Sequence, residues 1–153
     1  MRALLLAFVI LMAPIAAFAG TDIVAVCYKD CEAQTHSNPE YKACLARAAD
    51  KADAALNQAY KVMQDKIRAA AKEMGQPADT HLEDLKASQK YWINFRDANC
   101  TLEDNLAYGG TAMGGNYSAC LCSLSYERIN DFERMAKDVM GEPQSRRRGP
   151  NDA

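Results

Sequence analysis

The longest segment without proline or glycine, residues 40–74, constrains the fold most. It follows Asn38-Pro39, where asparagine is a preferred N-cap and proline a preferred first helical residue. Alanines are frequent, which favours a helix and permits close approach of a neighbour. Apolar residues recur in alternating steps of three and four, as on one helix face: Leu45, Ala49, Ala52, Leu56, Ala59, Met63, Ile67, Ala70 and Met74. The pattern predicts one long helix whose apolar face other helices must cover.

Two more helices are predicted beside it. Residues 21–35 form a short helical lead-in. Gly75-Gln76-Pro77 ends the long helix, and Thr80-x-x-Glu83 is a capping box that begins the next one. The predicted apolar side of this next helix consists of Leu82, Leu85, Trp92, Phe95, Leu102 and Leu106.

Four glycines in the stretch from Tyr108 to Tyr117 predict a loop there. A last helix is predicted to begin near Ser118 and to end at Gly141. No segment shows the alternation of a β-strand. Amphipathic helices hide their apolar faces against each other, so the predicted fold class is all-α. We expect a small disulfide-stapled bundle of three main helices, with antiparallel neighbours, plus a short N-terminal helix.

The N-terminal segment predicts export. Residues 3–17 are apolar apart from Pro14, and Ala17-Phe18-Ala19 matches the small-x-small pattern of signal-peptide cleavage. This run is shorter than the roughly 20 residues that a membrane-spanning helix needs. No cysteine directly follows the cut, which argues against a lipid anchor. We expect a signal peptide over 1–19, a soluble periplasmic or secreted domain over 20–141 and a disordered tail over 142–153.

All six cysteines follow the predicted cut: Cys27, Cys31, Cys44, Cys100, Cys120 and Cys122. An even number in a short exported chain indicates a disulfide framework, and six cysteines allow fifteen pairings. The alternative is a metal site, because two cysteine pairs are close in sequence. Neither pair has the spacing of a zinc knuckle or a histidine beside it, and His36 and His81 stand alone. We expect disulfides, with no metal and no other cofactor.

The charge balance is mildly acidic. The chain has 18 Lys and Arg against 20 Asp and Glu, and three of its arginines, Arg146, Arg147 and Arg148, lie in the tail. Nucleic-acid binding would require a basic face, which the sequence does not suggest. Three tail arginines give only marginal attraction to anionic lipid. The balance is compatible with a basic protein partner.

Motifs spread over residues 30–135 form a joint pattern. In chain order they are Asp30-Cys31, Cys44, Ala52-Asp53-x2-Leu56-Asn57-x2-Tyr60, Gln89-x2-Trp92-x2-Phe95-Arg96-Asp97-x2-Cys100-x2-Glu103, Gly109-Gly110-Thr111, Cys120-Leu121 and Ser125-x2-Arg128. Together they resemble the LprI-like family, small bacterial envelope proteins named after a mycobacterial lysozyme inhibitor. The resemblance implies a protein that binds and inhibits lysozyme without catalysis of its own.

The resemblance also implies a disulfide pairing. Four of the cysteines match those of the family, which suggests the bridges Cys31–Cys44 and Cys100–Cys120. Cys27 and Cys122 are additional, and we expect them to pair with each other. A second departure is that the family's namesake is a lipoprotein, whereas the lipid-accepting cysteine is missing here.

The motif residues are expected to be structural. Polar residues on inward helix faces need partners, so we predict a hydrogen-bond network among Asp53, Asn57, Gln89, Arg96 and Arg128. The alternative is catalysis. Asp97 and Glu103 lie six residues apart and therefore point away from each other on a helix, and neither histidine falls within the motifs. We expect no enzyme. The complete structural set is Asp53, Leu56, Asn57, Tyr60, Gln89, Trp92, Phe95, Arg96, Asp97, Glu103 and Arg128.

The glycine-containing loop is the predicted partner-binding region. It combines residue types that protein interfaces favour: Tyr108, Gly109, Gly110, Met113, Asn116 and Tyr117. It lacks the Lys-Ser/Thr that completes a phosphate-binding loop, and the alternative is a flexible connector. The leading hypothesis, from the resemblance, is a periplasmic protein that blocks c-type lysozyme by placing this loop at the cleft. The second is a non-enzymatic envelope adaptor that binds through its alanine-rich helix.

Overall fold

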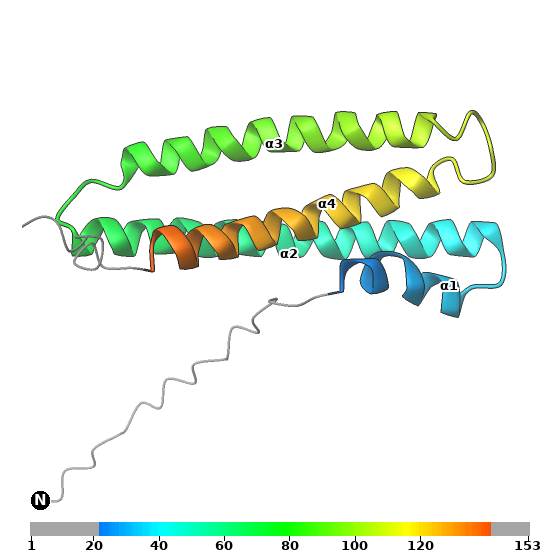
Figure 1. The fold of residues 1–153 in the computed structure, drawn as a ribbon, viewed down its shortest axis with the longest axis horizontal. Coiled ribbons are helices and arrows are strands. Elements are labelled where there is room, and N and C mark those ends of the chain that lie inside the picture. Colours follow the sequence, from blue (N-terminus) through cyan, green and yellow to red (C-terminus); the bar gives the residue numbers. More distant parts are fainter. Residues whose placement is uncertain (1–21, 142–153) are drawn as a thin grey trace, which may run out of the picture.

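The computed structural model describes residues 22–141, and in this range the chain contains helices and no strands (Figure 1). The all-α prediction is therefore confirmed. The α-helices are α1 (Asp30–Gln34), α2 (Asn38–Glu73), α3 (Asp79–Asn105) and α4 (Gly115–Arg134). Two short π-helices, η1 (Ala25–Lys29) and η2 (Met135–Val139), precede α1 and follow α4. The predicted signal peptide and tail lie outside the described residues.

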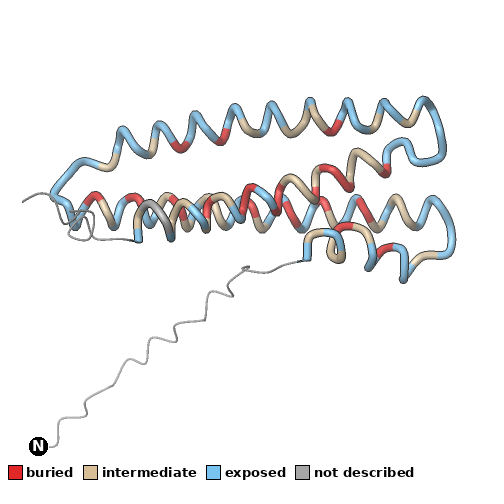
Figure 2. The backbone as a smooth tube through the Cα atoms, in the orientation of Figure 1, coloured by how far each residue is buried: buried red, intermediate tan, exposed pale blue. Residues whose placement is uncertain are grey.

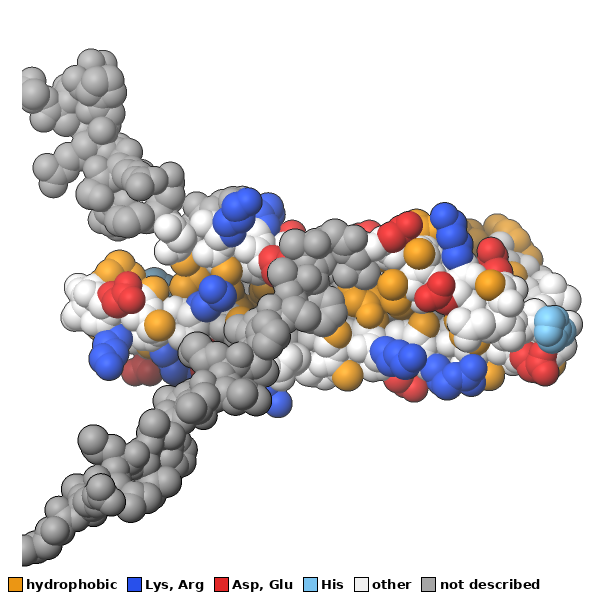
Figure 3. Space-filling view, turned by 90° about the horizontal axis from the view of Figure 1, so that it is seen from below, with side chains coloured by type: hydrophobic (Ala, Val, Ile, Leu, Met, Phe, Trp, Pro, Cys, Tyr) orange, Lys and Arg blue, Asp and Glu red, His pale blue; other side chains and the backbone are white. Residues whose placement is uncertain are grey.

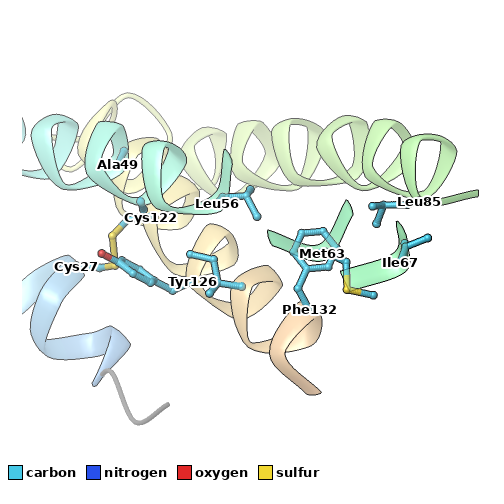
Figure 4. Close-up of a cluster of buried hydrophobic side chains, with 11 residues drawn as sticks. Cys27, Ala49, Leu56, Met63, Ile67, Leu85, Cys122, Tyr126 and Phe132 are labelled. Carbon is cyan, nitrogen blue, oxygen red and sulfur yellow. A yellow bond between two sulfur atoms is a disulfide. The ribbon is translucent and has the colours of Figure 1, made fainter. Parts of the chain in front are cut away.

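The core lies between α2 and α4, which run parallel because α3 returns the chain to the end where α2 began (Figure 1). The expectation of antiparallel neighbours therefore holds for α3 but not for this central pair. Most of the predicted stripe of α2 is buried, although Met74 is 56% exposed and Ala71 is buried beside Ala70. An α-helix drifts relative to a strict 3.5-residue repeat, which moves the buried position by one residue near the end. Figure 4 shows side chains of α2 and α4 meeting.

The predicted apolar side of α3 is partly wrong. Leu85 is buried, but Phe95, Leu102 and Leu106 are 57–59% exposed. Figure 2 shows α3 exposed along most of its length, with buried positions only towards α4. The inward face carries polar and sulfur-containing side chains instead, among them Gln89 and Cys100, so its neighbouring apolar residues are turned outwards.

Two predicted helix starts also differ. Ser37, and not Asn38, caps α2, because its Oγ accepts a hydrogen bond from the Glu40 amide at 3.4 Å. At α3, Ala78 precedes the first residue and no side chain caps the helix, so the predicted capping box at Thr80 is wrong. The helix begins one residue earlier than the motif indicated at α2 and two residues earlier at α3, since backbone geometry and packing compete with capping preferences.

Three disulfides fasten the helices to one another. Cys27–Cys122 joins η1 to α4, Cys31–Cys44 joins α1 to α2, and Cys100–Cys120 joins α3 to α4, with Cα–Cα distances of 5.8, 5.6 and 5.4 Å. Two of these pairs, Cys31–Cys44 and Cys100–Cys120, are those that the family resemblance implies, and the third joins the two additional cysteines as expected. The short N-terminal helix and α3 are thus each linked covalently to the central pair.

Candidate functional site

The connection between α3 and α4 projects from one end of the bundle (Figure 1). Tyr108 is 88% exposed, with a φ of 47° that lies in the left-handed region. Gly109 and Gly114 have φ values of 77° and 82°, which residues with a side chain rarely adopt. Met113, also in this connection, is 40% exposed. The backbone therefore turns sharply and leaves two large side chains accessible to a partner.

The connection between α3 and α4 is braced by hydrogen bonds from α3 and from the start of α2. The Asp104 Oδ1 atom accepts hydrogen bonds from the Gly114 amide at 2.6 Å and the Tyr117 amide at 3.2 Å. The Asn38 side chain donates to the Thr111 carbonyl oxygen at 3.1 Å, which ties the turn to the start of α2. Asp104 thereby supplies the N-terminal cap of α4 from another helix. This role could not be found in the sequence, because the two amides are 10 and 13 residues away.

These contacts correct the extent of the predicted loop. The last helix begins at Gly115, three residues before the predicted start at Ser118. Asn116 and Tyr117 therefore lie in the first turn of α4 and are half-buried. A Cβ on Gly115 would stand 3.4 Å from a Leu45 side-chain atom, so this end of α4 lies close against α2. The accessible surface is the turn over 108–114.

A polar network centred on Arg96 lies deeper in the bundle. Its guanidinium donates to Asp53 at 3.0 Å, to Asp97 at 2.9 Å and to Ser125 at 3.2 Å. The Asn57 amide donates to the second oxygen of Asp53 at 3.1 Å. Burial alone would lower the pKa of Arg96, but the hydrogen bonds and charges of Asp53 and Asp97 outweigh it and raise that pKa. The network joins α2, α3 and α4.

A second network surrounds Arg128, which is 8% exposed. The guanidinium donates to Gln89 at 3.2 Å and to Ser88 at 2.8 Å, and it lies 4.7 Å from the ring centroid of Phe132. Burial lowers the pKa of Arg128, with Asp131 opposing the shift. Arginine nevertheless remains charged at any pH that a folded protein experiences.

Trp92 links the two networks, because the guanidinium carbons of Arg96 and Arg128 lie 5.4 and 5.7 Å from its ring centroid. The structure thus brings all five predicted network residues together as two centres. Ser125 belongs to the family motif but was not predicted as a member of the network, and Ser88 lies outside the motifs, so its hydroxyl group gave no signal.

The remaining motif residues divide between core and surface. Leu56 is buried, and the Tyr60 ring lies 6.2 Å from that of Phe132. Phe95 and Glu103 are exposed, and neither belongs to the two networks.

The Arg96 centre also borders a cavity. A shallow cavity of about 320 Å³ is lined by Ala49, Asp50, Asp53, Arg96, Leu121 and Ser125. Its Asp53 and Arg96 are paired with each other, and Ser125 has no histidine within hydrogen-bonding distance among the residues 22–141. Within the same residues, no group of three His, Cys, Asp or Glu side chains could hold a metal ion.

Comparison with known proteins identifies the family. A family model described as lysozyme inhibitor LprI matches residues 29–132. The chain belongs to this family. The match includes α1, α2 and α3, the braced turn and α4 as far as Phe132, so it contains both arginine centres. The LprI family is a family of inhibitors.

A protein of Rhizobium meliloti (strain 1021) described as uncharacterised is 30% identical to this chain over 106 residues. The aligned region covers 67% of this chain and 76% of the relative. No solved structure matches the chain. Between residues 22 and 141, no helix is both long enough and apolar enough to cross a membrane.

Proposed function

We propose that this protein inhibits c-type lysozyme by binding over the substrate cleft of the enzyme. The observation that carries the proposal is the match to the lysozyme inhibitor family over residues 29–132. An inhibitor of this kind needs a rigid complementary surface and no catalytic group of its own. The protein is accordingly proposed to be a binding protein and not an enzyme.

The braced turn over 108–114 is the proposed contact region. Tyrosine is frequent at binding hot spots because it offers a large amphipathic surface at low entropic cost. Tyr108 is 88% exposed, and Met113 adds a flexible apolar side chain nearby in the chain. The hydrogen bonds from Asp104 and Asn38 hold the turn in place before binding. Such preorganisation lowers the entropy lost when a complex forms.

The segment that contains this turn has an acidic balance. No Lys or Arg occurs between Arg96 and Arg128, whereas Asp97, Glu103, Asp104 and Glu127 fall in that interval. One basic residue of α2, Lys42, lies beside Gly115 at the end of the turn. Electrostatic attraction between an acidic surface and a basic partner accelerates their association, and salt weakens this effect. Lysozymes of the c-type are strongly basic, so the encounter is favoured.

The proposed location is the periplasm or the extracellular medium. Disulfides persist in oxidising compartments, and the structure contains three of them. The proposed signal peptide over residues 1–19 would deliver the chain there. Lysozyme acts in the same space, on the cell wall.

A turbidity assay tests the proposal. Bacterial cell walls are incubated with c-type lysozyme and increasing amounts of the oxidised protein, and we expect lysis to stop near stoichiometric amounts. Full lysis at a large molar excess of the protein would overturn the proposal and would favour the envelope adaptor instead.

Substitutions in the turn test the contact region. We expect Tyr108→Ala to raise the inhibition constant by roughly 10- to 100-fold, as for a binding hot spot. Met113→Ala should have a smaller effect. Met74→Ala is the matched control, because Met74 is also exposed but lies at the end of α2. Unchanged inhibition by Tyr108→Ala, with retained helicity, would exclude the turn.

A further inference from the structure

The outer face of α3 carries exposed apolar side chains and no charged ones over about four turns. Tyr91 is 74% exposed, Phe95 57%, Leu102 59% and Leu106 58%. The other residues on this side of the helix are small or uncharged, among them Ala87, Asn94 and Ala98. On the side of the molecule that faces away from α3, acidic and basic side chains are interspersed with apolar ones (Figure 3). The α3 face therefore differs from an ordinary solvated surface.

The spacing along this face is that of a helix-pairing seam. Positions 91, 95, 98, 102 and 105 alternate steps of four and three residues. Helices whose contact residues follow this alternation pack side by side at a shallow angle. The α2 and α4 helices cover the opposite side of α3, through Leu85, Gln89 and Cys100. The seam thus has no partner within residues 22–141.

We propose that the α3 seam pairs with the α3 seam of a second copy of this chain, in an antiparallel dimer with two-fold symmetry. The seam is complementary to itself in one register. When Phe95 of one copy lies against Ala98 of the other, Tyr91 lies against Leu102. Two-fold symmetry forms each of these contacts twice. Large side chains then meet small or equally apolar ones along the whole seam.

Charge and area favour a second copy as the occupant. A charged partner would lose hydration on this face without gaining an ion pair. Two uncharged seams can meet without electrostatic repulsion. A large aromatic side chain buries about 150–250 Å². The half-exposed seams of two copies therefore offer on the order of 1,000 Å² together, near the lower end for a specific interface. Weak association that depends on protein concentration is therefore expected.

The dimer places one braced turn at each end of the paired seam. The helix α3 contains 27 residues, which corresponds to a length of about 40 Å. In the register that pairs Phe95 with Ala98, position 108 of one copy lies level with position 85 of the other, so each turn lies near the first turns of the partner's α3. Dimerisation is measured without lysozyme and inhibition is measured with it, so the two proposals fail separately.

Sedimentation of the purified, oxidised protein over a range of concentrations tests the dimer. We expect the apparent mass to rise towards twice the monomer mass as the concentration increases to roughly 500 μM. Leu102→Glu should raise the dissociation constant at least about 10-fold, because it buries an unpaired charge. Met74→Glu is the control, since Met74 is 56% exposed but lies at the end of α2, outside the seam. A protein that stays monomeric at roughly 500 μM would overturn the proposal, as would a dimer that survives Leu102→Glu.

A mixing experiment tests the register. Tyr91→Lys and Leu102→Glu should each give a monomer alone. Mixed together, they should form a heterodimer, because the register places the new lysine of one copy against the new glutamate of the other. Failure of the mixture to associate would exclude this register. A monomeric wild-type protein whose inhibition of lysozyme is weakened by Leu102→Glu, and not by Met74→Glu, would assign the face to lysozyme.

Discussion

The α2–α4 pair and the α3 helix are held in the bundle by different means. Leu56, Ile129 and Phe132 are at most 2% exposed between α2 and α4, so burial of apolar surface dominates there. Helix α3 has only Leu85, Gln89 and Cys100 buried, and its position depends on the Cys100–Cys120 bridge and two arginine centres. Directional links of this kind position a helix without burying its apolar residues.

The difference has a functional consequence. A helix that used its apolar residues for the core would present a charged surface to solvent. Helix α3 uses Gln89, Arg96 and Cys100 inward, and it therefore keeps Phe95 and Leu102 available for a partner. The same helix positions the proposed lysozyme-binding turn through Asp104. The α2–α4 pair contributes most of the buried apolar core, and α3 contributes exposed apolar side chains that a partner could contact.

Matched leucine substitutions should test the difference between the α2–α4 pair and α3 most clearly. We expect Leu56→Ala to lower the free energy of unfolding by about 2–5 kcal/mol, because it leaves a cavity between α2 and α4. Leu102→Ala should change it by less than about 0.5 kcal/mol, since the side chain is largely exposed. Urea unfolding of the two variants at low protein concentration measures both. Equal losses would show that α3 is packed as tightly as the central pair.

Removal of the bridge on α3 should have the next largest effect. We expect the double variant Cys100→Ala/Cys120→Ala to lose about 2–4 kcal/mol of unfolding free energy, as for a native disulfide. Hydrogen exchange should then show faster exchange of α3 amides than of α2 amides, because α3 has few other fixed contacts. The double variant Cys31→Ala/Cys44→Ala is the control. If it accelerates exchange in α3 to the same extent, the bridge to α4 is not what holds that helix.

The Arg96 centre should contribute less. Arg96→Met leaves Asp53 and Ser125 without their partner, and we expect a loss of about 1–3 kcal/mol. Arg68→Met is the control, because the Arg68–Asp65 pair is exposed on both sides and should contribute about 0–1 kcal/mol. Thermal unfolding followed by circular dichroism compares the two variants. A loss of stability in Arg96→Met no larger than in Arg68→Met would show that the Arg96 network does not hold α3 in place.

The two regions also differ in how far the sequence predicts them. The stripe of α2 is apolar and regular, so it predicts the helix and nearly all of its buried positions. On α3, the residues that face inward are polar, and a reading of apolar periodicity places Phe95 and Leu102 in the core. The family motif, in contrast, indicated the network of Arg96 and Arg128 correctly, since polar residues on inward faces need partners.

The candidate contact region was predicted less completely. The four glycines locate the turn, but they do not show where α4 begins. The Asp104 cap determines that start, and it connects groups that only the fold brings together. Capping within one helix is visible as a local motif, whereas capping from another helix is not.

The starts of α2 and α3 offer a smaller test of the comparison. The Ser37 hydroxyl caps α2, whereas no side chain caps α3. We expect Ser37→Ala to lower the free energy of unfolding by about 1 kcal/mol, as for other N-cap residues. Thr80→Ala should leave it nearly unchanged, although Thr80 fits the capping-box motif. A comparable loss of unfolding free energy in both variants, measured by urea unfolding, would show that Thr80 does cap α3.

The smallest expected effect concerns Glu40, next to the same cap. Its carboxylate accepts a hydrogen bond from the His36 amide at 3.1 Å, which lowers the pKa of Glu40. A carboxyl group with a lowered pKa stabilises the fold above its unfolded value of about 4.3 and loses that contribution as the pH falls through the folded value. The stability difference between wild type and Glu40→Gln should therefore be present at pH 7 and vanish at strongly acidic pH. A difference that stays constant with pH would mean that the charge of Glu40 adds nothing to the start of α2.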